Sequence, residues 1–276
     1  MDHQGTTNQA GGKWALVTGA SAGIGAEFCR QLADRGYSIV LVARREDRLQ
    51  DLAGSLTAQN PIECRCLAAD LADPGACAQI VDFLSREKIE LEFLVNNAGY
   101  GVAGAFNEAA WPVHADFITV MLTAVCELSW YLLPGMQERG KGYIVNVSSL
   151  AGLAPAAARN TLYGAVKAFL IKFSQSLAME NLDTGVAVSA LCPGFTYSEF
   201  HDVLGIRKQV NELPSWMWLT AEEVVRYGID SVTREQPRIV AVPGKANRFI
   251  AMLIKQLPAK LTQALTQRES RRWLKP

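Results

Sequence analysis

Tyr163 and Lys167 are the residues whose types and spacing most directly suggest chemistry. They stand four residues apart in a segment that predicts a helix beginning near Thr161, so they lie on one helix face about one turn apart. An unperturbed tyrosine has a pKa of ~10, and a nearby ammonium favours the phenolate. The spacing therefore predicts a phenol whose pKa is lowered by Lys167 and which exchanges protons near neutral pH.

The same spacing occurs on ordinary surface helices, so the segment before this helix matters. Residues 143–147 form an apolar run typical of a buried strand, and Ser148 and Ser149 follow it directly. A loop then leads into the predicted helix. We expect the chemistry to take place in this stretch, from Tyr143 to Lys167.

A glycine-rich turn near the N-terminus predicts a phosphate site. The apolar run 14–18 is followed by a GxxxGxG segment over residues 19–25 and then by a helical pattern that ends at Gly36. Between a strand and a helix, such glycines let backbone N–H groups and a helix N-terminus approach a phosphate. The spacing is not the commoner GxGxxG, and a glycine-rich turn is also an ordinary strand-to-helix connection.

The second predicted strand, residues 38–42, bears on the choice of cofactor. It is followed by Arg44 and Arg45, and no acid occurs before Glu46. Guanidinium groups suit a 2′-phosphate, whereas a carboxylate suits a free ribose hydroxyl, so NADP(H) is favoured over NAD(H). Alternatively, the two arginines cap the strand and face water. Ala22 stands where a second basic residue of the turn would have helped.

Two further strands end in polar residues. The strand 63–69 ends at Asp70, whose carboxylate can accept a hydrogen bond from an adenine amine or can cap the following helix. The strand 91–95 is followed by an Asn-Asn-Ala-Gly turn over residues 96–99. In open α/β folds, ligands bind at this carboxyl edge of the sheet.

Strand patterns alternate with helical patterns along the chain, which predicts an α/β fold with a parallel sheet between helices. Further helices are expected at 46–58, 74–88, 108–137 and 161–181, and further strands at 186–191 and 238–242. We expect one domain over residues 12–245, with an apolar substrate lid at 195–219. Residues 246–276 form an amphipathic extension that could dock on the core, cover the active site or rest on a membrane surface.

Composition excludes several classes of protein. The 276 residues suffice for one large domain, and 27 basic against 27 acidic residues indicate no nucleic-acid partner. Six scattered cysteines without a CxxC motif predict reduced thiols and no metal site, hence a cytoplasmic protein. The polar N-terminus does not resemble a secretory signal, and no run reaches the ~18 to 20 apolar residues of a membrane span.

Five motifs occur in an order that resembles the short-chain dehydrogenase/reductase family. They are residues 18–25 (TGASAGIG), 96–99 (NNAG), 148–149 (SS), 163–167 (YGAVK) and 192–194 (CPG). The resemblance covers roughly residues 12–245. It implies a doubly wound Rossmann fold with a seven-stranded parallel sheet, a nicotinamide cofactor, and a homodimer or homotetramer that pairs through helices 108–137 and 161–181.

The resemblance also implies roles for individual residues. Tyr163 would protonate a carbonyl oxygen, Ser149 would hydrogen-bond the same oxygen, and Lys167 would hold the nicotinamide ribose and lower the Tyr163 pKa. The residues expected to line the cofactor are Gly19, Ser21, Ala22, Gly23, Ile24, Gly25, Arg44, Arg45, Asp70, Leu71, Asn97, Ala98, Gly99, Tyr163, Lys167, Pro193, Gly194 and Thr196.

The sequence departs from the family pattern at two places. The family usually has an asparagine thirteen residues before Pro134, where it holds a relay water, but this chain has Met121, whose thioether cannot donate. Thr123 or an extra water could replace it. In addition, Ser149 stands fourteen residues before Tyr163 rather than thirteen, which indicates an inserted residue near Arg159 and leaves Ser148 as a second candidate.

The sequence therefore predicts an NADPH-dependent reductase, reversible as an alcohol dehydrogenase. The apolar lid suggests an acyl, steroid or polyketide-like carbonyl. One alternative, motivated by Met121, is an NADP(H)-binding sensor or scaffold on the same fold. Another is an epimerase that oxidises its substrate transiently.

Overall fold

The computed structural model describes residues 13–156, 158–159, 161–197, 214–258 and the single residues 261, 264, 266, 267 and 271. Its centre is a seven-stranded parallel sheet in the order β3-β2-β1-β4-β5-β6-β9, which confirms the predicted doubly wound fold. The strands are β1 Trp14–Thr18, β2 Ser38–Ala43, β3 Cys64–Ala68, β4 Leu91–Asn96, β5 Gly142–Val147, β6 Val186–Leu191 and β9 Val240–Ala241. β9 is shorter than the predicted strand 238–242 because it pairs only with the end of β6.

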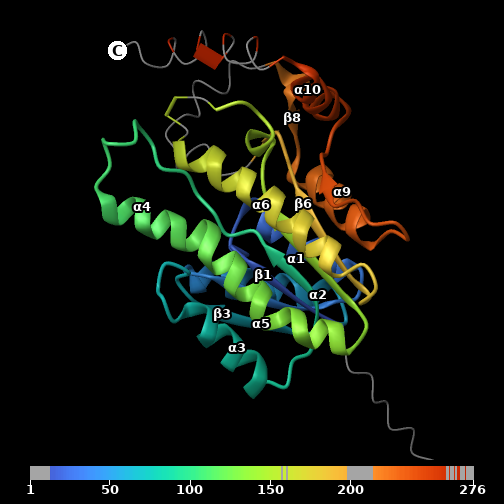
Figure 1. The fold of residues 1–276 in the computed structure, drawn as a ribbon. Coiled ribbons are helices and arrows are strands. Elements are labelled where there is room, and N and C mark those ends of the chain that lie inside the picture. The colour runs from blue at the N-terminus through green and yellow to red at the C-terminus, as the bar shows by residue number, and fades with distance from the viewer. Residues whose placement is uncertain are drawn as a thin grey trace, which may run out of the picture.

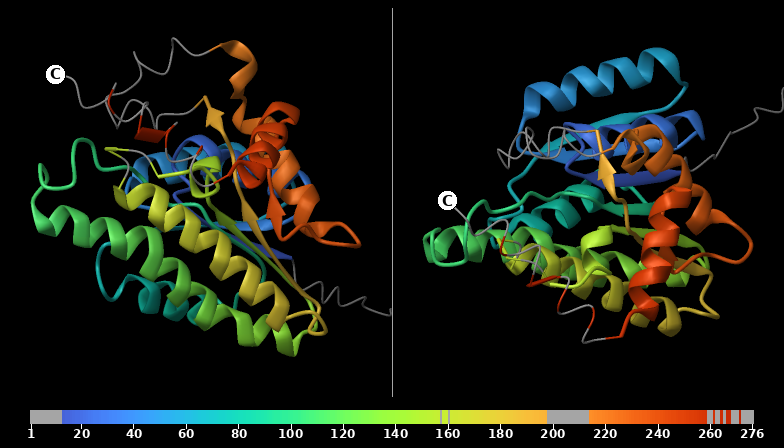
Figure 2. Two further views of the ribbon diagram at one scale, coloured as in Figure 1. Left: turned by 45° about the horizontal axis from the view of Figure 1, so that its top comes forward. Right: turned by 90° about the horizontal axis from the view of Figure 1, so that it is seen from above.

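Helices cover both faces of this sheet (Figures 1 and 2). α1 Gly23–Asp34, α2 Glu46–Gln59 and α9 Ala221–Thr233 cover one face. α3 Ala76–Arg86, α4 Trp111–Ile118, α5 Ala124–Glu138 and α6 Thr161–Glu180 lie on the other, and α10 Lys245–Gln256 follows β9. The view from above shows these three layers, with the sheet between the helices (Figure 2, right).

Alternation along the strands explains why both faces are apolar. In β1, Ala15 and Val17 pack among the residues of α1 and α9, whereas Leu16 packs on the opposite side. Because both faces are covered, the strands read as continuous apolar runs rather than as alternating ones.

The long helix predicted at 108–137 is present at Trp111–Glu138, with a π-helical turn, η1 Thr119–Thr123, between α4 and α5. Its apolar window has a mean hydropathy of 1.5 and is long enough to cross a membrane by length and composition. Asp116 and Glu127 interrupt the helix, so no unbroken run reaches the ~18 to 20 apolar residues named above. A core helix passes the same test. Phe117 and Leu128 are completely buried, and α5 packs against β4 and β5. This part of the chain therefore behaves as a core helix.

The predicted lid is described only in part. β7 Phe195–Thr196 pairs in parallel with β8 Trp218–Leu219, and η3 Ser215–Met217 precedes β8. Tyr197 stacks on Trp218 with ring centroids 4.6 Å apart. Residues 198–213 of the predicted lid lie outside the described residues.

The turn between β1 and α1 is held very close to the turn after β4. The Asn97 side chain donates to the Thr18 carbonyl at 2.9 Å, and Thr18 Oγ1 accepts from the Asn97 and Ala98 amides at 3.0 Å each. Gly19 has a φ of 67°, and a Cβ added at Gly25 would stand 2.2 Å from the Gly19 carbonyl oxygen. Only glycine fits this contact, because backbone meets backbone.

We expect Gly25→Ala to destabilise the fold by about 2 kcal/mol or more, because the methyl group must displace backbone. Chemical denaturation measures this change. The matched control is Gly54→Ala in α2, where an added Cβ meets nothing within 4 Å. That variant should be neutral or stabilised by about 0.5–1 kcal/mol. Equal effects of the two variants would contradict the packing argument.

Candidate functional site

The N-terminus of α1 forms a cradle for an anion. Its N-cap residue, Ala22, makes no side-chain cap, so the first amides of the helix are not satisfied by a cap side chain. The left-handed Gly19 and the missing Cβ of Gly25 keep the turn compact. Ser21, Gly23 and Ile24 complete this turn. A cradle that a Cβ would fill, next to a helix N-terminus, fits the pyrophosphate of a dinucleotide.

Two guanidinium groups stand beside this cradle. Arg45 donates to Ser21 Oγ through Nε at 3.2 Å and Nη2 at 3.0 Å. Arg44 Nη1 lies 3.6 Å from Asp70 Oδ2, and both side chains are substantially exposed. The two arginines are therefore turned toward the glycine turn and the end of β3. This arrangement suits recognition of a phosphate.

The turns after β3 and β4 supply the next wall. Asp70 Oδ1 accepts from the Ala72 amide at 3.0 Å, so this carboxylate does stabilise its own turn, while its other oxygen faces Arg44. Leu71 is buried. Asn97 and Ala98 are fixed by Thr18, as described above, and a Cβ on Gly99 would lie 2.6 Å from Met121 Sδ.

The two serines after β5 have different surroundings. Ser148 is buried and its hydroxyl donates to the Lys167 carbonyl at 2.6 Å, so it holds the backbone of α6. Ser149 Oγ accepts from the Ala151 amide at 3.1 Å and is hydrogen-bonded to Tyr163. The structure therefore brings Ser149, rather than Ser148, to the phenol. Arg159, in the longer loop before α6, has a left-handed φ of 60°.

Lys167 lies beneath the phenol, as the helical spacing predicts. Its Nζ is 5.6 Å from the Tyr163 ring centroid and donates to the Val147 carbonyl at 2.7 Å. The side chain is buried next to the Cys192 thiol. An ammonium in this position is held by β5 and cannot swing into solvent.

The expected depression of the Tyr163 pKa is wrong for this structure. Burial raises the pKa of Tyr163 to about 12, against a smaller lowering by its hydrogen bond to Ser149. Burial also lowers the pKa of Lys167 to about 8. Desolvation disfavours the charged form of each group and is the largest cause of both pKa shifts. The phenol is therefore a proton donor at neutral pH.

Met121 occupies the position where the family usually has asparagine. It is buried in an apolar cluster with Phe117, Val125, Val166 and Leu170, against which Tyr163 packs. The π-helical turn at η1 forms without an asparagine. Thr123, the suggested replacement, is exposed, which places it away from the buried ammonium.

The segment after β6 closes the site from the other side. The Pro193 carbonyl accepts from the Leu150 amide at 2.8 Å and lies 3.5 Å from Ser149 Oγ. Thr196 is buried and its hydroxyl donates to the Gly194 carbonyl at 3.1 Å. Residues 193–196 are thus fixed next to the serine and face the same edge of the sheet as the glycine turn.

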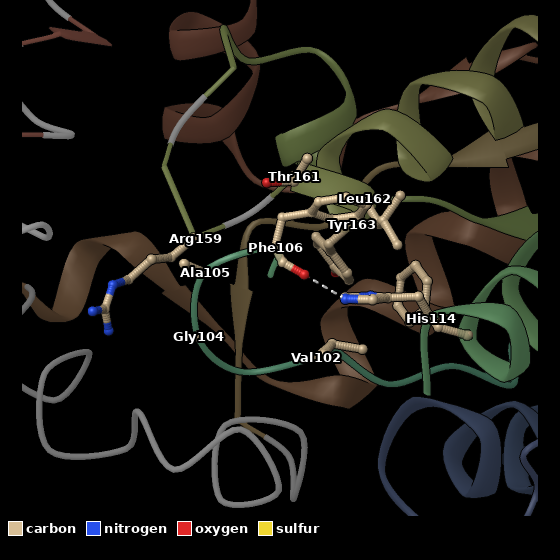
Figure 3. A pocket seen from close by; sticks show the side chains of 10 residues that line it. Val102, Gly104, Ala105, Phe106, His114, Arg159, Thr161, Leu162 and Tyr163 are labelled. Carbon is tan, nitrogen blue, oxygen red and sulfur yellow. Dashed lines mark hydrogen bonds between the residues drawn. The ribbon is translucent and has the colours of Figure 1, made fainter. Parts of the chain in front are cut away.

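A small pocket opens at Tyr163 (Figure 3). Its apolar lining includes Val102, Phe106, Phe117 and Leu162. His114 Nε2 lies 2.7 Å from the Phe106 carbonyl, so this nitrogen carries the proton, and the buried Nδ1 has no partner among the described residues. Arg159 lies at the rim and points away from the other labelled side chains.

Sequence reasoning missed His114. It is one of only three histidines and stands in the first turn of a long apolar helix. Rarity and position were the available signals. Neither reveals that the ring faces the pocket, because that depends on how α4 packs against the loop before it.

The chain is similar to several known proteins. The family model for short chain dehydrogenases matches residues 13–207. The very-long-chain 3-oxoacyl-CoA reductase-A of Danio rerio is 33% identical, over 80% of this chain and 69% of its own length. The 7beta-hydroxysteroid dehydrogenase of Collinsella aerofaciens is 31% identical, over 67% and 69%. A short-chain dehydrogenase from Sphingobium yanoikuyae in complex with NADPH has a TM-score of 0.77 and 32% identity, covering 90% of this chain and 97% of that one.

Proposed function

The chain belongs to the short-chain dehydrogenase/reductase family, and we propose that within it the chain is an NADPH-dependent reductase of apolar ketones or aldehydes. Family membership makes it an oxidoreductase acting on alcohol or ketone groups, so the alternative of a binding-only sensor is not retained. The observation that carries the proposal is a neutral phenol, hydrogen-bonded to Ser149 and underlain by Lys167, at the wall of an apolar pocket.

A bound nicotinamide would supply the hydride that reduces the carbonyl carbon. Tyr163 donates its phenolic proton to the carbonyl oxygen as the C=O bond becomes a C–O single bond. Ser149 donates a hydrogen bond to that oxygen and stabilises its developing charge. The Lys167 ammonium stabilises the phenolate that remains on Tyr163. In the reverse direction, the same phenolate accepts the proton of an alcohol.

The residues that would hold the cofactor are those gathered at the carboxyl edge of the sheet. The glycine turn fits the pyrophosphate, Lys167 the nicotinamide ribose, and residues 193–196 the nicotinamide end. The two arginines favour NADP(H) over NAD(H), because Arg45 contacts Ser21 of the glycine turn and Arg44 lies beside Asp70 at the end of β3. A solved relative contains NADPH.

The substrate class follows from the pocket. Its lining combines the apolar side chains with the polar groups of His114, Arg159, Thr161 and Tyr163, which suits a carbonyl on a hydrophobic skeleton. Two similar proteins are named as reductases or dehydrogenases of such molecules, an acyl-CoA and a steroid.

We also propose a cytoplasmic location for the protein. The described cysteines are free thiols, which supports this location.

We expect Tyr163→Phe to lower kcat by at least about a thousandfold, because the proton donor is lost while the ring remains. NADPH affinity, measured by fluorescence titration, should stay within about threefold. The matched control is Tyr227→Phe, a tyrosine of α9 outside the pocket lining, which should keep most of its turnover. Near-normal reduction by Tyr163→Phe across a panel of apolar ketones would refute the assignment.

We expect kcat/KM for reduction to fall as the pH rises through about 8, the Lys167 pKa. A lysine whose pKa is lowered by burial is charged below that pH and neutral above it, so support for the phenolate is lost on the alkaline side. The measurement is a pH profile with NADPH at saturation. The residual activity of Lys167→Arg, whose guanidinium stays charged, should lack this fall. A wild-type profile flat to about pH 9.5 would contradict the role of Lys167.

We expect Arg45→Ala to weaken NADPH binding by roughly 10-fold to 100-fold, because a charged hydrogen bond to the 2′-phosphate is lost. NADH binding should change little. Arg30→Ala, which removes an exposed arginine elsewhere on α1, is the control. If Arg45→Ala weakened the binding of NADPH and NADH equally, the arginine would not recognise the 2′-phosphate.

We further propose that copies of the chain pair through α5 and α6. These helices expose Trp130, Tyr131 and Phe169, which are large apolar side chains for a free surface. Sedimentation should show a dimer or tetramer at micromolar concentration, and Trp130→Ser should shift it toward monomer. Leu182→Ser, at an exposed position just after α6, is the control. Only monomers in the wild type would exclude this assembly.

A further inference from the structure

The basic charge of the chain is concentrated at its C-terminal end. Residues 245–276 contain eight lysines and arginines and one glutamate, a formal charge of +7. The chain as a whole has 27 basic and 27 acidic residues, so residues 1–244 carry −7. Such an asymmetry directs one end of a protein toward an anionic surface.

α10 opens this basic segment and exposes large apolar side chains. Phe249, Met252 and Leu253 are 57%, 47% and 42% exposed. They stand at i, i+3 and i+4, so they share one helix face. The sequence of α10 contains no acidic residue. The exposed cations of this helix are Lys245, Arg248 and Lys255.

Neighbouring residues extend the same kind of surface. η3 contacts α10 and exposes Trp216, which is 61% accessible. Leu261, just past the helix, is 47% exposed. β8 and α10 lie at the same end of the molecule (Figure 1). Tryptophan is enriched where proteins meet the headgroup region of a bilayer.

The opposite face of α10 is fully used by the fold. Asn247 and Ala251 are buried, and the Asn247 side chain donates to the Pro243 carbonyl at 3.0 Å. A Cβ added at Gly194 would come within 2.7 Å of the Asn247 amide. The helix is therefore fixed against the segment that closes the catalytic site. Its exposed apolar face is not needed for that packing.

We propose that the outward face of α10, together with Trp216, docks on an anionic lipid surface. Lipid headgroups complement the cations, and the acyl boundary accommodates the apolar side chains. A second copy of the chain fits less well, because a two-fold interface places each patch against itself and brings its three cations close to those of the partner. Docking here would face residues 193–196 toward a source of apolar substrates.

The test is co-sedimentation of the full chain with vesicles of phosphatidylcholine alone or with about 30 mol% phosphatidylserine. Wild-type protein should bind the anionic vesicles at least tenfold more strongly, and this excess should disappear at about 0.5 M NaCl. Lys245→Gln/Lys255→Gln and Phe249→Ser/Leu253→Ser should each lower binding at least tenfold. The measurement requires no turnover, so its outcome is independent of the proposed reaction.

Matched variants remove the same groups elsewhere. Arg86→Gln/Lys172→Gln deletes two exposed cations, and Met179→Ser/Leu182→Ser deletes two exposed apolar side chains; both should bind like wild type. NADPH titration and thermal unfolding check that each variant is folded. The proposal is overturned if the wild-type protein does not bind anionic vesicles, or if the α10 variants bind them as strongly as the wild-type protein does. It is also overturned if Phe249→Ser/Leu253→Ser dissociates an oligomer without changing vesicle binding.

Discussion

The parallel register of the central sheet is the constraint on which the site depends. β1, β4, β5 and β6 are neighbours in the sheet, and each runs in the same direction as the next. The glycine turn, the Asn-Asn turn, the serines and the Pro-Gly segment each follow one of these strands. Parallel pairing therefore collects groups that are far apart in the sequence at one edge. The hydrogen bonds from Asn97 and Ala98 to Thr18 then fix the distance between two of the turns.

Burial controls the chemistry of the two central groups. The Lys167 ammonium and the Tyr163 phenol are both moved toward their neutral forms, because a low-dielectric surrounding penalises charge. Among the described residues, the Lys167 ammonium donates to the Val147 carbonyl and forms no ion pair with a carboxylate. A carboxylate partner would raise the pKa of the lysine and would compete with a phenolate for its charge. The arrangement instead leaves a proton donor and a titratable cation next to each other.

The two faces of α10 have different surroundings. Its inner face is small and polar because it packs against Gly194, where even a methyl group would collide with Asn247. Its outer face exposes large apolar side chains and basic ones, of which Arg248 also lies over the Tyr227 ring of α9. α10 therefore lies between the segment that closes the site and any surface on which its outer face docks.

The sequence by itself determined the order of strands and helices, the glycine turn, and the placement of Tyr163 over Lys167. These depend on local periodicity and on residue types at fixed spacing, which need no knowledge of distant contacts. The capping box of Thr220 and Glu223 at the start of α9 is local in the same way. The family motifs added the role of Ser149 over Ser148, which the structure supports through the hydrogen bond to Tyr163.

Only the tertiary structure decided the direction of the pKa shifts, the position of His114 and the two faces of α10. Each depends on how much solvent the surrounding elements remove. Helical spacing placed an ammonium near a phenol, but it could not show that desolvation would dominate the pKa of each group. Hydropathy likewise could not distinguish the helix Trp111–Glu138 from a spanning segment until its packing against β4 and β5 was known. Spacing along a chain fixes which groups are neighbours, whereas burial, which sets their energies, is a property of the whole fold.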